Sequence, residues 1–94
     1  MTTRLTAALI ALDEEARIAR AVRSVSFADE VLVVDGGSRD RTREVAGESG
    51  ARVVERPWTG FAAARRHAIE EARGAWILFL DADEYLAAPF PGGR

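Results

Sequence analysis

The sequence predicts an α/β fold, a Rossmann-like parallel sheet in three layers with helices on both faces. Short apolar runs at residues 5–12, 30–35, 51–55 and 75–80 indicate buried strands, because they are too short for helices. Amphipathic segments separate these runs in the order β-α-β-α-β-α-β. Strands and helices that alternate at intervals of roughly 20 to 25 residues are typical of parallel strands joined by right-handed crossovers.

The first strand is expected over Leu5–Leu12, a short apolar run bounded by polar residues. From Glu14 onward, apolar residues recur at spacings of three and four, which predicts an amphipathic helix. These residues are Ile18, Val22 and Val25. Asp13 directly precedes the helix and is its expected N-cap.

The second strand is expected over Glu30–Asp35, whose uniformly apolar, β-branched interior is typical of a central parallel strand. Gly36-Gly37-Ser38 makes the turn after it. Asp40 is the expected cap of a second helix, which Gly50 closes. A third strand follows over Ala51–Glu55.

Pro57 ends this stretch, and Gly60 opens a third helix with a face of mostly small apolar side chains. They are Phe61, Ala64, Ala68, Ile69 and Ala72. Gly74 is expected to stop this helix before the fourth strand, Ala75–Leu80. The tail at residues 87–94 has no periodicity and is expected to be irregular.

The composition limits the classes of function. The 94 residues form at most one small domain and could be a piece of something larger, and the net charge of -2 offers no electrostatic basis for binding nucleic acid. Because the chain has no cysteine, thiolate metal sites are excluded and oxygen ligands remain, which suit Mg²⁺ or Mn²⁺. No apolar run approaches the roughly 20 residues that span a bilayer. The expected location is cytoplasmic, with peripheral attachment at the inner face of the membrane left open.

Asp81 and Asp83 directly follow the fourth apolar run. Two residues apart, they point to one face of a strand, and both can reach one cation at the carboxyl edge of the sheet, where open α/β folds bind ligands. Mg²⁺ and Mn²⁺ take few carboxylates together with phosphate oxygens and water. For an isolated pair, a simple role in capping the turn after the strand deserves more weight.

Asp35 ends the second strand, a position that suits hydrogen bonding to a base or a ribose, although Asp before two glycines is also an ordinary turn former. The following Gly36-Gly37-Ser38 would let the backbone approach a ligand closely. It matches neither the dinucleotide fingerprint nor the phosphate-binding loop with its Gly-Lys-Ser/Thr. Hydride transfer and P-loop ATP hydrolysis are therefore disfavoured.

Arg65 and Arg66 lie on the third helix. Adjacent helical residues point about 100° apart, so only one of them can face a site. Arg65 is the candidate for contact with a diphosphate, and a solvated surface charge is an equally weighted alternative. Trp58 and Phe61 are interpreted as core aromatics that anchor the loop before this helix.

Three motifs, in their order and spacing, resemble those of the N-terminal half of family 2 glycosyltransferases. They are Ala11–Glu15, Val33–Thr42 and Leu78–Glu84. The intervening Phe27–Glu30 and Arg56–Phe61 are similar to the subgroup that adds sugars to the core of bacterial lipopolysaccharide. The resemblance runs over residues 5–86 and implies that residues 1–86 are the nucleotide-sugar-binding half of a GT-A domain, which is incomplete here.

The resemblance also implies roles for individual residues. Asp81 and Asp83 match the motif that binds the divalent metal, Mg²⁺ or Mn²⁺, which bridges the donor diphosphate. Asp83 is the preferred direct ligand, and Asp81 is also expected to bind the nucleotide. Glu14 and Asp35 match positions near the nucleoside, and Arg65 matches a basic position near the diphosphate. Two departures from the family pattern lie in the same loops. They are Asp13, where Asn is usual, and Gly36, where a second Asp is frequent, which leaves base specificity open.

The activity that the resemblance implies is inverting transfer of a sugar from a nucleotide-diphosphate sugar to an acceptor whose hydroxyl loses its proton to a base. That base is expected outside this chain, so no residue here is assigned as catalytic. A glycan or lipid-linked acceptor, in lipopolysaccharide or cell-envelope glycan synthesis, is expected to bind the missing half of the full-length protein. The alternatives are a non-catalytic nucleotide-binding module or remnant, a nucleotidyltransferase and a phosphoacceptor domain. An open sheet edge would favour self-association.

Overall fold

The computed structural model describes residues 4–81 of the chain. Four parallel strands form one sheet in the order β3-β2-β1-β4. The strands are β1 (Leu5–Ala11), β2 (Glu30–Asp35), β3 (Arg52–Glu55) and β4 (Trp76–Asp81). They alternate with the helices α1 (Glu15–Ser24), α2 (Thr42–Glu48) and α3 (Phe61–Glu71). The predicted α/β fold is confirmed, and each strand lies within one residue of its predicted bounds.

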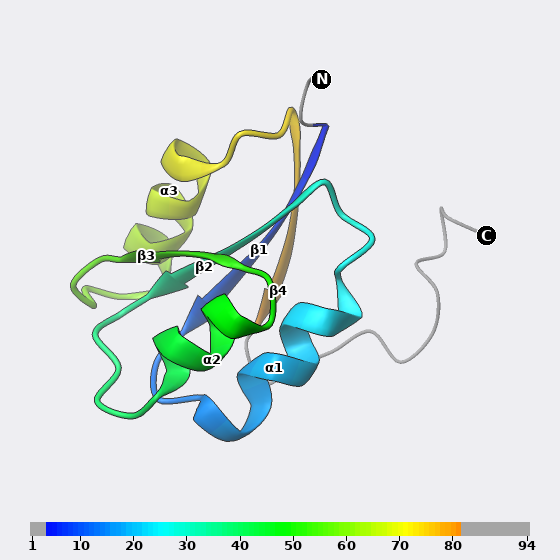
Figure 1. Cartoon of the computed structure of the whole chain (residues 1–94). Coiled ribbons are helices and arrows are strands. Elements are labelled where there is room, and N and C mark those ends of the chain that lie inside the picture. Colours follow the sequence, from blue (N-terminus) through cyan, green and yellow to red (C-terminus); the bar gives the residue numbers. More distant parts are fainter. Residues whose placement is uncertain (1–3, 82–94) are drawn as a thin grey trace.

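The helices cover both faces of the sheet, as Figure 1 shows. Helices α1 and α2 pack on one face, where Ile18 and Ala46 join Leu9 and Val33 in the larger part of the core. Helix α3 packs on the other face, where Ala68 meets Ala8, Leu32 and Val34. Because successive side chains of a strand point to opposite faces, β1 and β2 are buried on both sides and consist almost entirely of apolar residues.

The register of the strands brings three chain segments to the carboxyl edge of the sheet. β1 lies between β2 and β4, with Ala11 opposite Asp35 and Ile10 opposite Asp81. The loop after β1, the loop after β2 and the end of β4 therefore meet at one place. None of the helices within residues 4–81 combines the length and the apolar character that a bilayer-spanning helix needs.

The prediction that Asp13 caps α1 is wrong. The N-cap position is Glu14, whose own side chain makes no capping hydrogen bond. Asp13 instead has a left-handed backbone, with φ of 53°, which Asp tolerates better than most residues. Its carboxylate accepts a hydrogen bond from the backbone N–H of Arg39 at 2.7 Å. The side chain that was expected to cap α1 therefore binds the loop after β2 instead.

Asp40 caps α2 from one residue further upstream than a standard N-cap. The N-cap position is Arg41, and the Asp40 carboxylate accepts the backbone N–H of Thr42 at 2.9 Å. The other end of α2 is as predicted, because Gly50 adopts a φ of 109° that favours glycine. The N–H groups after the helix donate back to its last turn in the paired pattern of a Schellman motif.

Gly74 does not stop α3, which ends at Glu71. Gly74 is required for a different reason, because the turn before β4 passes close to the start of β1 at this residue. A Cβ at this position would lie 2.7 Å from the backbone nitrogen and 2.8 Å from Oγ1 of Thr6. The Gly74 N–H donates to that same hydroxyl at 3.0 Å, so close approach between the two segments requires glycine here.

The apolar face of α3 is narrower than the sequence predicts. Ala64 and Ala68 are buried against the sheet, whereas Phe61 and Ile69 are exposed. The small side chains let the helix approach the strands closely, which leaves the two larger residues outside the contact. Phe61 lies at the start of the helix, beside the carboxyl edge of the sheet.

Candidate functional site

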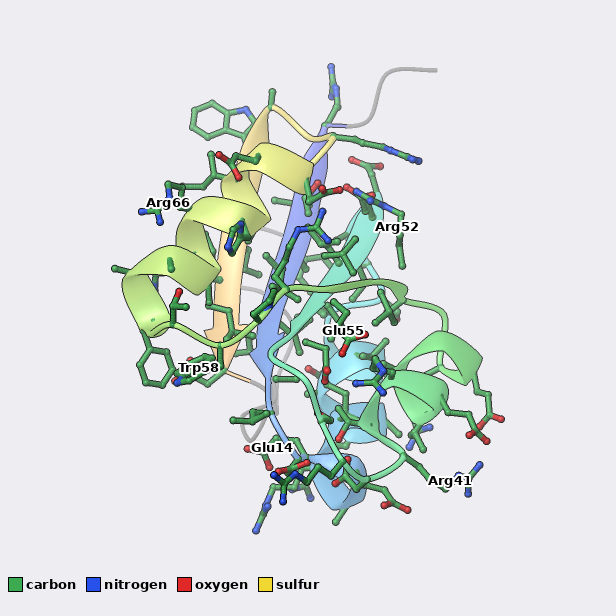
Figure 2. All side chains as sticks on the ribbon, turned by 90° about the vertical axis from the view of Figure 1, so that its left-hand side faces the viewer. Glu14, Arg41, Arg52, Glu55, Trp58 and Arg66 are labelled. Atoms are coloured by element: carbon green, nitrogen blue, oxygen red, sulfur yellow. The ribbon has the colours of Figure 1, made fainter. Side chains whose placement is uncertain are left out.

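A pocket of about 250 Å³ lies at the carboxyl end of β1. Its lining combines residues from the end of β1, the loop before α3, the first turn of α3 and the end of β4. They are Ile10, Ala11, Leu12, Glu14, Trp58, Phe61 and Asp81. Figure 2 shows Trp58 and Glu14 at this end of the sheet. The pocket is therefore at the edge where open parallel sheets bind ligands.

The pocket brings together two acidic residues that the sequence predicts for the site, Glu14 and Asp81. Glu14 comes from the loop after β1, and Asp81 ends β4, in register with Ile10 of β1. The Glu14 carboxylate accepts a hydrogen bond from Nη1 of Arg17, one turn along α1, at 3.0 Å. Carboxylate oxygens are the ligands that Mg²⁺ and Mn²⁺ prefer, so the chemistry of this edge fits such an ion.

The loop after β2 fixes the backbone around Glu14. The Glu14 N–H donates to Oγ1 of Thr42 at 2.8 Å, and the preceding Asp13 N–H donates to Oγ of Ser38 at 2.9 Å. The following N–H, that of Glu15, donates to Oδ2 of Asp40 at 3.1 Å. Three consecutive N–H groups at the start of α1 thus find acceptors on the neighbouring loop. We call this set of hydrogen bonds between residues 13–15 and residues 38–42 the loop clasp.

The loop clasp is reciprocal. The first loop returns carboxylate acceptors to the second, from Asp13 to the N–H of Arg39 and from Glu15 to the N–H of Arg41. The hydrogen bond from the Thr42 side chain, followed by those from backbone N–H groups, holds the pKa of Asp40 below its usual value. Asp40 is therefore ionised at neutral pH and serves both helix starts.

Asp35 is fully buried and stabilises the turn that follows β2. One carboxylate oxygen accepts the N–H groups of Gly37 and Ser38 at 2.9 and 2.8 Å, and the other accepts the Ser38 hydroxyl. Nη1 of Arg43 donates to the first oxygen at 2.9 Å. Burial alone would raise the pKa of Asp35, but these hydrogen bonds outweigh it and lower that pKa. The structure does not bring this predicted nucleotide-binding residue into the pocket lining.

Arg65 is exposed on α3 and also lies outside the pocket lining. Its guanidinium carbon lies 5.5 Å from the centre of the Phe79 ring on β4, within the range of a cation-π contact. Phe79 and Asp81 are two apart on the strand and point to the same face. The contact therefore places the Arg65 cation on the face of β4 that also carries Asp81.

Trp58 and Phe61 are not the buried loop anchors that the sequence analysis predicts. Their exposed fractions are 39% and 61%, and both line the pocket. The two rings meet edge to face, with centroids 5.0 Å apart and planes 88° apart. The available signal was their position, since they flank Gly60 between a strand end and a helix start, at the edge of the sheet where ligands bind.

Of the two predicted metal ligands, the structure describes one. Asp81 lines the pocket, and Asp83 lies outside the residues that the structure describes. Within residues 4–81, no group of three or more acidic or histidine side chains is arranged to hold a metal ion. Among the described residues, Asp81 and Glu14 are the carboxylates that line the pocket.

Sequence comparison connects this chain with known proteins. Residues 6–89 match glycosyl transferase family 2. An uncharacterized glycosyltransferase of Rickettsia bellii is 43% identical over 88 residues, which are 93% of this chain and 30% of the relative. The lipopolysaccharide core biosynthesis glycosyltransferase LpsC of Rhizobium meliloti is 33% identical over 87% of this chain and 32% of its own length.

Structural comparison agrees. Glucosyl-3-phosphoglycerate synthase from Mycobacterium tuberculosis, solved in complex with Mn²⁺, uridine diphosphate and glucosyl-3-phosphoglycerate, superposes with a TM-score of 0.78 at 30% identity. The match covers 88% of this chain and 36% of that one. The same enzyme has also been solved with Mg²⁺ and uridine diphosphate, and that structure has a TM-score of 0.78. The chain thus spans about a third of the length of the relatives it matches.

Proposed function

Because the chain belongs to glycosyl transferase family 2, we propose that residues 1–86 bind the nucleotide-diphosphate part of a sugar donor at the carboxyl edge of the sheet. The observation that carries the proposal is the pocket at the end of β1, which Glu14 and Asp81 line from two segments far apart in the sequence. Two further facts support it. The fold matches GT-A glycosyltransferase structures, and one of these was solved with Mn²⁺ and uridine diphosphate.

In this proposal Asp81 and Asp83 hold Mg²⁺ or Mn²⁺, with Asp83 as the direct ligand. When bound, such an ion offsets the negative charge of the diphosphate leaving group. Glu14 lies toward the nucleoside, and the loop clasp fixes its backbone. Arg65 meets the diphosphate from the α3 side of β4. Asp35 acts on the nucleotide indirectly, because its carboxylate holds the turn at Gly37 and Ser38.

The proposed reaction of the full-length protein is inverting transfer of the sugar to a glycan or lipid-linked acceptor in lipopolysaccharide or cell-envelope glycan synthesis. Support for this pathway is the 33% identity to the lipopolysaccharide core biosynthesis glycosyltransferase of Rhizobium meliloti. The base that deprotonates the acceptor hydroxyl is proposed to lie outside this chain. A cytoplasmic location, with peripheral attachment at the inner face of the membrane, would place the site beside such acceptors.

We also propose that the chain associates with itself through the open edge of β4. β4 is the last strand on its side of the described sheet. Its first residue, Trp76, has a side chain that is 75% exposed. Unpaired strand edges readily pair with other strands. Sedimentation equilibrium over a range of concentrations tests this, and a monomer at all of them would contradict it.

The test of the donor site is calorimetric titration of the 94-residue chain with UDP, and with ADP for comparison, with and without Mn²⁺. We expect binding that requires the metal and is lost in Asp83→Ala and Asp81→Asn. Binding without metal dependence would contradict the assigned role of the two aspartates. Absence of binding by a chain that circular dichroism shows to be folded would contradict the proposed function. Binding without transfer, even by the full-length protein, would favour a non-catalytic nucleotide-binding module.

A further inference from the structure

We propose that Trp58 and Gly36 together adapt the pocket to a planar nucleobase. In this proposal the base stacks on the indole of Trp58, which forms one wall of the pocket, and Gly36 leaves the space that the indole needs. The inference rests on the proposed function, because it assigns the base-binding part of the same pocket. It concerns Trp58, to which the family resemblance gives no role, and Gly36, at which this sequence departs from the family pattern. It also gives a physical reason for the glycine at the end of β2.

Trp58 lies on the side of Gly36 where a side chain would project. A Cβ added to Gly36 would lie 3.1 Å from Cε3 and 3.3 Å from Cβ of the tryptophan, and 3.7 Å from Cδ1 of Leu12. The backbone of Gly36 lies outside the left-handed region, unlike that of Gly37, so glycine is not required here for its conformation. A Cβ at position 36 would press against Trp58, which would have to move by a few tenths of an ångström to admit it.

The indole is held in place yet remains accessible. Gly36, directly after β2, lies beside the indole. The ring of Phe61 packs against the indole edge to face, with the ring centroids 5.0 Å apart. Even so, 39% of Trp58 is exposed and the residue lines the pocket. Figure 2 shows Trp58 near the carboxyl end of β1. An aromatic side chain that is already fixed loses little conformational freedom when a ligand stacks on it.

The apolar part of the pocket suits a nucleobase better than a diphosphate. Trp58 and Phe61 form an apolar part of the pocket with Ile10, Ala11 and Leu12, and the carboxylates of Glu14 and Asp81 are its acidic part. A diphosphate requires cations, which the apolar part lacks. A nucleobase is uncharged and planar, and stacking on an aromatic side chain strengthens binding by about 5- to 150-fold per base.

The test uses the tryptophan as its own probe. The chain has two tryptophans, so Trp76→Phe, outside the pocket, leaves Trp58 as the single emitter and is also the matched control. In this background, UDP with Mn²⁺ should quench Trp58 emission with the dissociation constant that calorimetry gives. Trp58→Ala should weaken UDP binding by about 5- to 150-fold and pyrophosphate binding by less than about twofold. Trp58→Phe, which keeps an aromatic ring, should lie between the two and serves if the alanine variant does not fold.

Gly36→Ala and Gly36→Asp test the second member of the pair. Both should displace Trp58, change its emission without ligand and weaken UDP binding, with the larger effect for Asp. Combined with Trp58→Ala, neither should weaken binding further, because the wall has already been removed.

Two outcomes would overturn the inference while the proposed function stands. One is metal-dependent UDP binding that Trp58→Ala leaves unchanged. The other is an equal loss of UDP and pyrophosphate affinity, which would mean that Trp58 only supports the fold. Failure of the folded parent chain to bind UDP, ADP and pyrophosphate would overturn the proposed function itself, and this inference with it.

Discussion

The hydroxyl of Thr42 accepts the backbone N–H of Glu14 at 2.8 Å, so the first residue of α2 fixes the residue that precedes α1. Thr42 is fully buried, and its hydroxyl proton is donated to Asp40. One side chain therefore connects the two loops that lie beside the pocket. The position of Glu14 depends on a residue that is far from it in the sequence.

Thr42→Val should test this connection, because valine keeps the shape and removes the hydroxyl. The Glu14 N–H loses its acceptor and Asp40 loses a donor, so the free energy of unfolding should fall by about 1–3 kcal/mol. UDP affinity should fall with it as Glu14 becomes less fixed. Urea denaturation and calorimetry measure the two effects. Thr42→Ser, which keeps the hydroxyl, is the control, and equal stability of the Val variant and the parent would contradict the role of the clasp.

Asp35→Asn should lower the free energy of unfolding at pH 7 by about 1.5–3 kcal/mol, since a buried acceptor of several hydrogen bonds loses its charge. The pKa of Asp35 is lowered in the folded state. Its stabilising contribution is therefore complete above the unfolded pKa of about 3.9 and is lost as the pH falls through the folded pKa. Urea denaturation between pH 7 and pH 3 should show a weaker acid dependence in the variant. The same dependence in both proteins would argue against this assignment.

Gly74→Ala should destabilise the protein by about 1–3 kcal/mol, because the new methyl group would overlap the backbone of Thr6. Gly47→Ala is the matched control. Its new Cβ would meet nothing within 4 Å and would lie inside α2, where alanine is favoured over glycine by up to about 1 kcal/mol. Thermal or urea denaturation should move the two variants in opposite directions. Destabilisation of both would point to a general intolerance of change at glycine.

Arg65→Ala should weaken UDP binding by about 3- to 10-fold, the effect of losing one partly exposed charged contact. Arg66→Ala removes the same charge from the next residue of α3, which is also exposed. Its effect on affinity should be less than about twofold. Comparing the two variants by calorimetry at low and high salt separates a directed contact from the general charge of the helix. Equal losses would indicate only the general effect.

The fold could be predicted from local patterns because its strands are short, apolar and separated by regular helices. The bounds of β2 are as predicted, and Gly50 ends α2 as expected. The errors occurred where distant segments meet. From local sequence, Asp13 is expected to cap α1 and Gly74 to end α3. In the structure they contact Arg39 and Thr6, which come from other parts of the chain.

The sequence indicated which acidic residues lie at strand ends, but not which of them are held by hydrogen bonds within a loop. Glu14 and Asp81 follow or end strands, and parallel strands deliver such residues to one edge. Asp35 has the same kind of position, yet its hydrogen bonds keep it inside the turn. No local sequence pattern distinguishes a carboxylate that faces a pocket from one whose oxygens already accept hydrogen bonds from backbone N–H groups. Trp58 was missed for a related reason, since its neighbour Gly36 lies on another strand end.

The position of β4 beside β1 has a consequence for the order of assembly. Glu14 belongs to the first loop and Asp81 to the last described strand, so the pocket combines opposite ends of the described chain. Contacts between such distant residues form late, because a long loop must close before they gain any energy. On the ribosome, β1, α1 and β2 can pair while the pocket still lacks one wall. The pocket would then be completed in a single step, when β4 takes its place next to β1.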